Sequence, residues 1–122
     1  MNRVVQFQVT AHNPERAAAF YSQAFGWHIQ SYEGAMEYWF IQTGDDAQPG
    51  INGGIMRHDG QMPNVINTVG VASLDESLEA VVKSGGQIVQ PKFNVPGMGY
   101  LAYIVDTEGN MFGLMQYDSS VQ

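Results

Sequence analysis

Hydrophobic and polar residues alternate at the start of the chain. In the first nine residues, Val5, Phe7 and Val9 are separated by Gln6 and Gln8. A period of two predicts a β-strand with one face toward a core and the other facing outward. Because a secretory signal has a continuous apolar stretch instead, we expect a cytoplasmic protein.

A helix is predicted directly after this strand. Asn13 is a good N-cap, Pro14 fits the first helical position, and Glu15 complements the positive end of the helix dipole. Gly26 ends the helix, because glycine takes the left-handed C-cap conformation without steric cost. Apolar residues at helical spacing predict one stripe that packs inward. The stripe consists of Ala17, Phe20, Tyr21 and Ala24.

The rest of the chain predicts seven strands and a second helix. The strands are expected at Trp27–Tyr32, Glu37–Thr43, Ile51–Arg57, Val65–Ala72, Gln87–Gln90, Tyr100–Val105 and Met111–Gln116. The second helix begins at the capping box of Ser73 and Glu76 and closes at Gly85 and Gly86. Its inward stripe consists of Leu74, Leu78, Val81 and Val82. A proline- and glycine-bearing loop is expected over Pro91–Gly99.

The two halves repeat one pattern. A shift of 60 positions carries the helix start at Asn13 onto the helix start at Ser73, and both halves predict the order βαβββ. The first module covers about residues 1–57 and the second about residues 64–118. We expect one α+β domain over residues 1–122, in which two tandem modules form an eight-stranded curved sheet around a cavity, with one helix per module on the outside.

Composition excludes several classes of function. Five basic and twelve acidic residues give a net charge of −7, which repels a nucleic-acid backbone. No apolar run approaches the length of a membrane helix. The absence of cysteine excludes disulfides, thiolate metal ligands and cysteine nucleophiles. We therefore expect neither nucleic acid nor a membrane as a partner.

Two motifs resemble the glyoxalase-related branch of the vicinal oxygen chelate superfamily, which contains glyoxalase I, bleomycin resistance proteins and extradiol dioxygenases. The run from Asn13 to Trp27, NPERAxxFYxxxFGW, is similar to its first-helix signature. The pieces PGxGY and DTEGNxFG, between Pro96 and Gly113, are similar to its closing hairpin. The resemblance covers nearly the whole chain and implies a small-molecule cavity and a homodimer.

In metal-dependent members of this superfamily, His and Glu side chains hold a divalent ion. The resemblance places the corresponding positions at Gln6, Gly53 and Gly113 and within Ile66–Thr68. Glycine has no side chain to coordinate a metal, and a glutamine carbonyl is a weak substitute for imidazole. We therefore expect no bound metal and no cofactor.

The histidines do not fall on these positions. His12, His28 and His58 are expected at or near the surface, although an improvised site using two of them remains open. Asp106 and Gly109 belong to the second motif, and we expect them to shape a turn.

Strand parity suggests which residues contact a ligand. Gln6 and Gln8 lie opposite the apolar residues of their strand, and methionines flank Gly113. On the third strand, parity alone does not decide between Tyr38 with Phe40 and Trp39 with Ile41. Ordinary core packing is an alternative for the methionines and aromatics. The candidate ligand-binding residues are Gln6, Gln8, Tyr38, Phe40, Thr68, Met111 and Met115.

Three functions remain open. The first is metal-free binding of a small, largely apolar or aromatic molecule. The second, an enzyme, is a glyoxalase-related lyase or isomerase with an atypical metal site. The third is sequestration of a cationic antibiotic, as in bleomycin resistance, which the acidic balance favours.

Overall fold

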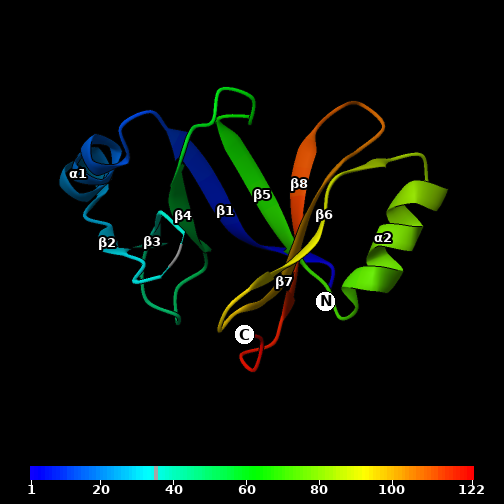
Figure 1. The fold of residues 1–122 in the computed structure, drawn as a ribbon. Coiled ribbons are helices and arrows are strands. Elements are labelled where there is room, and N and C mark those ends of the chain that lie inside the picture. The colour runs from blue at the N-terminus through cyan, green and yellow to red at the C-terminus, as the bar shows by residue number, and fades with distance from the viewer. Residues whose placement is uncertain (35) are drawn as a thin grey trace. The chain divides into compact units, whose positions relative to one another are not determined.

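The computed structural model describes residues 1–34 and 36–122 and contains eight strands and two helices in those residues (Figure 1). The elements are β1 (Arg3–Ala11), α1 (Pro14–Phe25), β2 (His28–Ser31), β3 (Tyr38–Gln42), β4 (Asn52–Arg57), β5 (Val65–Gly70), α2 (Leu74–Lys83), β6 (Gln87–Val95), β7 (Gly99–Val105) and β8 (Met111–Tyr117). The strands are hydrogen-bonded in the order β2-β3-β4-β1-β5-β8-β7-β6, which makes one mixed sheet. The predicted α+β class and the duplicated βαβββ order are therefore confirmed. Neither described helix is long and apolar enough to cross a bilayer.

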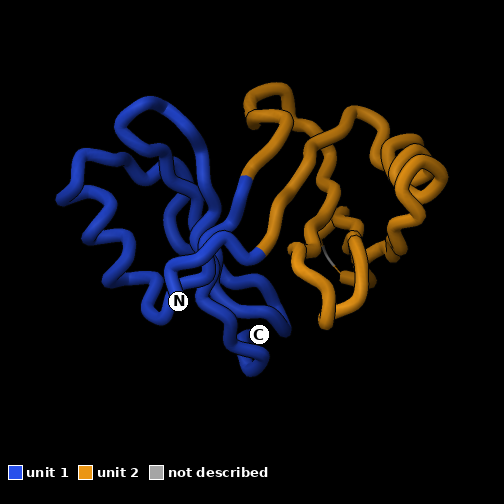
Figure 2. The backbone as a smooth tube through the Cα atoms, turned by 180° about the vertical axis from the view of Figure 1, so that it is seen from behind, with its two compact units in different colours: residues 1–5, 67–122 blue, residues 6–66 orange. Residues whose placement is uncertain are grey.

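The chain divides into two compact units, coloured separately in Figure 2. One unit is residues 6–66 and the other combines residues 1–5 with 67–122. We call them the first-half unit and the second-half unit. Both β1 and β5 contribute residues to each unit, so the predicted single domain remains a prediction that unfolding experiments address.

In the first-half unit, one face of the sheet packs toward α1. β1 runs parallel to β4, which is antiparallel to β3. Phe7 of β1 contacts Trp27, and Trp27 stacks on Tyr21 of α1, with ring centroids 5.8 and 5.3 Å apart. Ile41 and Ile55 share the face of Phe7 and are buried. Because side chains alternate along a strand, Gln6 and Gln8 lie on the opposite, helix-free face.

In the second-half unit, α2 covers one face of β6, β7 and β8. The core between them consists of Val71, Leu74, Leu78, Ala102, Ile104 and Leu114. The Ser73 hydroxyl accepts a hydrogen bond from the backbone N–H of Glu76, which confirms the serine half of the predicted capping box. The helix-free face carries Thr68, Met111 and Met115.

The helical stripes are only partly as predicted. Leu74 and Leu78 are buried, whereas Val82 at the edge of the α2 stripe is exposed. On α1 the stripe prediction was wrong at Phe20 and Ala24, which are exposed, while Tyr21 is half-buried. α1 packs mainly against β2 and β4, and these strands leave Phe20 and Ala24 uncovered.

The predicted loop over Pro91–Gly99 was wrong in its first half. β6 continues to Val95, and its register against β7 shifts between Ile88 and Gln90 and again between Gln90 and Phe93. Pro91 lies in this second irregularity. A proline cannot donate to a ladder of hydrogen bonds, but a bulge on an edge strand tolerates it.

Candidate functional site

The helix-free face of the first-half unit is built around Gln8. Gln8 is only 4% exposed, and its register partner on β4 is Gly54. On the other side of Gly54, the register partner is Phe40 of β3. These three residues lie in a row across three strands, with an amide at one end, a bare backbone in the middle and an aromatic ring at the other end.

Tyr38 fills the space above Gly54. A Cβ atom added at Gly54 would collide with the phenol of Tyr38, so the ring lies across the glycine. The Tyr38 and Phe40 rings contact each other edge to face, with centroids 5.2 Å apart. Strand register places Tyr38 and Phe40, and not Trp39 and Ile41, on the face of Gln8.

The second-half unit has a matching arrangement around Thr68. Thr68 is fully buried, and its register partner on β8 is Gly113. Gly113 in turn pairs with Tyr103 of β7. A Cβ atom at Gly113 would lie 2.9 Å from the Thr68 Oγ1 atom and 3.4 Å from the Tyr103 ring. A buried polar residue, a glycine and a tyrosine therefore occupy adjacent strands in this unit as well.

The Thr68 hydroxyl has no hydrogen-bond partner among the described residues. A buried hydroxyl without a partner costs about 1–3 kcal/mol, because it has lost its bonds to water and gained none in return. Such atoms are rare in folded proteins, and where one occurs a bound molecule or a water commonly supplies the missing bond. Among the described residues, the Thr68 Oγ1 atom is thus a buried polar atom on this face that a bound molecule could pair with.

Apolar groups lie on the same face as Thr68. Met115 is buried, and Met111 is half-buried two residues earlier on β8. Phe93 of β6 stacks on Tyr103, with ring centroids 6.4 Å apart. Aromatic rings provide flat contact surfaces, and methionine side chains adapt to different shapes.

Gln8 and Thr68 occupy the same place in the repeat. Each lies five residues before a helix N-cap, at Asn13 and Ser73. The 60-residue offset fails on the last strands, however. The glycine paired with Gln8 is Gly54, whereas Gly53 pairs with Phe7 on the helix side. The predicted equivalence of Gly53 with Gly113 is therefore wrong by one residue, which on a strand means the opposite face.

The residues at the family's metal positions do not fit a chelated cation. Gly54 and Gly113, the glycines on the helix-free faces, have no side chain to donate to a metal, and Gly113 is closely packed against Thr68. The polar residues Gln6, Gln8 and Thr68 offer only amide or hydroxyl oxygens. Within residues 1–34 and 36–122, no group of three or more His, Cys, Asp or Glu side chains is placed to hold a metal. The expectation of a metal-free protein stays a prediction to be measured.

The histidines lie apart from these faces or at their edge. The rings of His12 and His58 contact each other with centroids 4.6 Å apart, at the ends of β1 and β4. The His58 Nδ1 atom accepts a hydrogen bond of 2.8 Å from the backbone N–H of Gly60. His28 is exposed on the edge strand β2.

Asp106 and Gly109 shape the β7–β8 turn, as predicted. The Asp106 Oδ1 atom accepts hydrogen bonds from the backbone N–H groups of Asn110 and Glu108, at 2.9 and 2.8 Å. The bonds from Asn110 and Glu108 lower the pKa of the Asp106 carboxyl below its usual value. Gly109 has a φ of 85°, a value that disfavours other residues.

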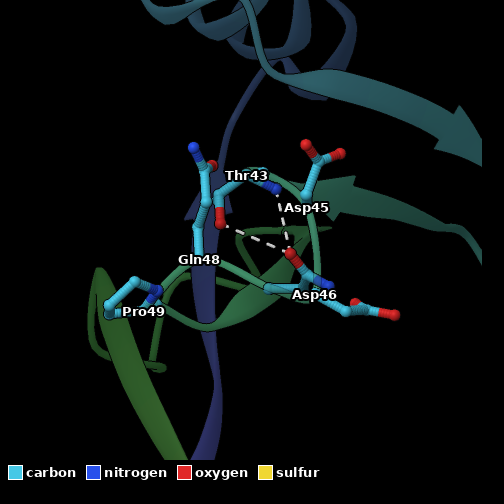
Figure 3. A pocket seen from close by; sticks show the side chains of 8 residues that line it. Thr43, Asp45, Asp46, Gln48 and Pro49 are labelled. Atoms are coloured by element: carbon cyan, nitrogen blue, oxygen red, sulfur yellow. Dashed lines mark hydrogen bonds between the residues drawn. The ribbon is translucent and has the colours of Figure 1, made fainter.

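A small polar hollow lies in the loop between β3 and β4 (Figure 3). Its volume is about 140 Å³, and it is lined by Thr43, Gly44, Asp45, Asp46, Gln48, Pro49, Gly50 and Asn52. The Thr43 backbone N–H donates to the Asn52 Oδ1 atom at 2.9 Å, and the Thr43 hydroxyl donates to the Ile51 carbonyl at 2.7 Å. These bonds hold the two ends of the β3–β4 loop together. The hollow is therefore explained by the shape of the loop and does not require a ligand.

No protein-family model and no curated protein matches the sequence. Solved structures do match. Methylmalonyl-CoA epimerase from Streptomyces coelicolor, in complex with 2-nitronate-propionyl-CoA, superposes with a TM-score of 0.74 at 12% identity, covering 100% of this chain and 99% of that chain. A glyoxalase/bleomycin resistance protein/dioxygenase superfamily member from Vibrio splendidus 12B01 gives a TM-score of 0.67 at 12% identity, covering 95% and 98%.

The chain has the vicinal oxygen chelate fold. A third structure, methylmalonyl-CoA epimerase from Mycobacterium tuberculosis, agrees, with a TM-score of 0.72 at 11% identity over 93% of this chain and 87% of that chain. Sequence identities this low establish the fold alone. The ligand of this member of the fold has to be argued from its own residues.

Two residues of the candidate site were missed at the level of sequence. The sequence predicts a strand that contains Tyr103 but no site role for it, and it points to Gly53 instead of Gly54. No sequence signal marked Tyr103, because the run Tyr100–Val105 is apolar throughout and does not alternate. No signal marked Gly54 either, because two adjacent glycines give no indication of which one lies on the helix-free face.

Proposed function

We propose that this protein binds a small, uncharged, largely apolar or aromatic molecule on the helix-free faces of its sheet strands, without a metal. The observation that carries the proposal is the buried Thr68 hydroxyl, which has no partner among the described residues and lies beside Gly113. A ligand with a hydrogen-bonding group would satisfy that atom. Tyr103, Met111 and Met115 would contact its apolar body.

The proposal includes the corresponding residues of the first half. Gln8 would offer an amide, and Tyr38 with Phe40 would offer aromatic contact. Gln6 shares the face of Gln8 at a half-buried position. Amides and hydroxyls both donate and accept, so either face suits a neutral group such as a phenol, ketone or amide.

The lack of charged residues at the register positions of these faces supports a neutral ligand. The positions in register on the helix-free face of the first-half unit carry amide, hydroxyl, imidazole, aromatic, methionine and glycine residues. They are Gln6, Gln8, Thr10, His28, Gln30, Tyr38, Phe40, Gln42, Asn52, Gly54 and Met56. None is Asp, Glu, Lys or Arg. A charged ligand group buried there would lack a counter-ion, which is costly.

The second-half unit gives the same result. Its register positions on the helix-free face are Thr68, Gly70, Gln87, Gln90, Phe93, Val95, Gly99, Leu101, Tyr103, Val105, Met111, Gly113, Met115 and Tyr117. None is charged. The acidic residues of the chain therefore lie away from these register positions, which weakens the hypothesis that the protein binds a cationic antibiotic. The phosphates of a ligand such as the one bound by the Streptomyces epimerase would likewise meet no lysine or arginine here.

Pairs of neutral compounds and their charged analogues test the proposal. Thermal-shift and calorimetric screening would compare neutral aromatic compounds with analogues that differ by one carboxylate, phosphate or ammonium group. Neutral members should bind, and a ligand at 100 times its dissociation constant should stabilise the protein by about 2.7 kcal/mol. Binding of only the charged members, or of none, contradicts the proposal.

A further inference from the structure

Phe40 is an exposed aromatic ring on the helix-free face of the first-half unit. Its side chain is 36% exposed. The Tyr32 and Tyr38 rings contact it edge to face, with ring centroids 5.6 and 5.2 Å away. Aromatic pairs prefer particular ring orientations, so the two tyrosines restrict the rotation of the Phe40 ring. Phe40 therefore presents a flat apolar surface to solvent in a restricted orientation.

Neutral polar side chains lie on several sides of Phe40. Its register partners are Gln30 on β2, which is exposed, and Gly54 on β4. Gln8 of β1 is the next residue in this row, and Gln42 lies on the same face two residues further along β3. An amide both donates and accepts hydrogen bonds and carries no charge. A ligand ring that lies on Phe40 would therefore meet neutral hydrogen-bonding groups around its edge.

The repeat provides an internal comparison for this ring. In the second-half unit the corresponding row consists of Thr68, Gly113, Tyr103 and Gln90. The aromatic residue of that row, Tyr103, is only 8% exposed. The two halves therefore place an aromatic residue at the same point of the sheet, and only Phe40 is open to solvent to this extent.

The neighbouring row of face positions also differs between the halves. In the first half it contains Gln6, Asn52 and Gln42. In the second half the corresponding positions on β8 and β7 are Met111 and Val105, which are apolar. The first-half face is therefore the more polar of the two, and none of its register positions is charged.

We propose that the first-half face binds a neutral sugar ring, free or as part of a glycoside, which stacks on Phe40. The inference rests on the proposed function and names the class of ligand group that this face binds. The C–H groups on one side of a sugar ring form an apolar surface that packs on an aromatic ring. Its hydroxyl groups project from the edge, where the amides of Gln30 and Gln8 can donate and accept. A phosphorylated sugar would lack a counter-ion at these positions.

Calorimetric titration with matched compounds tests the proposal. The probes are phenyl glucoside, phenyl galactoside and phenyl xyloside. The reference compound is 2-phenoxytetrahydropyran, which has the same ring and phenyl group without hydroxyls. At least one glycoside should bind about 10-fold or more tightly than the reference compound, because only the glycosides can pair with the amides.

The outcomes separate this inference from the proposed function. Equal or tighter binding of 2-phenoxytetrahydropyran overturns the sugar assignment and leaves a neutral-ligand site in place. Binding of neutral aromatic compounds without binding of any glycoside has the same meaning. Failure of every neutral compound overturns both.

Substitutions locate the sugar ring on the first-half face. Gln30→Leu removes one amide at an exposed position. It should weaken glycoside binding by about 10-fold and change the affinity for 2-phenoxytetrahydropyran by less than about 2-fold. Phe40→Ala should weaken both compounds, because both present an apolar ring face. Gln23→Leu at an exposed position of α1 is the matched control and should bind like wild type. Glycoside binding that withstands both Gln30→Leu and Phe40→Ala overturns the proposal.

Discussion

Gly113 and Thr68 are register partners on adjacent parallel strands, and a Cβ atom at Gly113 would lie 2.9 Å from the Thr68 Oγ1 atom. The contact leaves no room for a side chain at 113 unless Thr68 moves. Thr68 is fully buried and β-branched, so its freedom to move is small. The glycine therefore keeps the backbone of β8 close to a hydroxyl that has no hydrogen-bond partner among the described residues.

The first prediction concerns this contact. Gly113→Ala should lower the free energy of unfolding by about 1–3 kcal/mol, because the new methyl group overpacks against Thr68. Denaturant unfolding measures the effect. In a Thr68→Ala background the same substitution should cost clearly less, because the obstructing Oγ1 atom is gone. Additive costs would show that the strain at position 113 comes from elsewhere.

The equivalent glycine of the first half provides a second prediction. A methyl group at Gly54 would meet the far end of the half-buried Tyr38 side chain, which can shift without moving the backbone. Gly54→Ala should therefore destabilise the protein less than Gly113→Ala. It should also weaken ligand binding, because Tyr38 is displaced from its face. The comparison fails if Gly54→Ala is the more destabilising of the two or leaves binding unaltered.

The third prediction concerns acid. Hydrogen bonds lower the pKa of Asp106 in the folded state, so its charged form stabilises the protein above the unfolded-state pKa of about 3.9. That contribution is lost as pH falls through the lower folded-state pKa. Asp106→Asn should melt at a lower temperature than wild type at neutral pH, and the difference should shrink as the pH falls through the lowered folded-state pKa of the wild-type carboxyl. A difference in melting temperature that is constant with pH would contradict this role.

The fourth prediction concerns metals. Because glycine occupies the helix-free positions 54 and 113, added Zn²⁺, Ni²⁺ or Mn²⁺ should not raise the melting temperature, and a chelator should not lower it. Ligand affinity should be equal with and without the chelator. Stoichiometric metal in the purified protein, with loss of binding on chelation, would contradict the proposed metal-free site.

The predicted single domain is the subject of the fifth prediction. The first residues of β1 belong to one unit and the remainder to the other, so unfolding of either unit should disturb a strand of its neighbour. Calorimetry should show one transition with equal calorimetric and van't Hoff enthalpies. Two separated transitions would indicate that the units unfold independently.

The sequence predicted the fold well because local signals agreed with one another. Asn13 and Gly26 bracket α1 as expected, and Asp106 shapes its turn. The errors came from effects with no local signal. A bulge carried β6 past Pro91, and Phe20 was left uncovered by a sheet whose extent the helix pattern does not reveal.

The candidate site was predictable in part for the same reason. Alternation placed Gln8 and Thr68, while the choice of Tyr38 over Trp39 and of Gly54 over Gly53 required the register between strands. Register depends on pairing partners far away in the sequence. That the Thr68 hydroxyl has no hydrogen-bond partner among residues 1–34 and 36–122 follows from three-dimensional packing, which the sequence does not reveal.

The most direct test of the account is calorimetric titration of wild-type protein and Thr68→Val with the best neutral ligand from the screen, alongside the stability of each protein without ligand. Valine has nearly the same shape but no hydroxyl. We predict that Thr68→Val is more stable than wild type without ligand, by about 1 kcal/mol, and binds the ligand about 10-fold more weakly. A variant that is less stable without ligand, and that binds as tightly as wild type, would contradict the claim that this hydroxyl awaits a ligand.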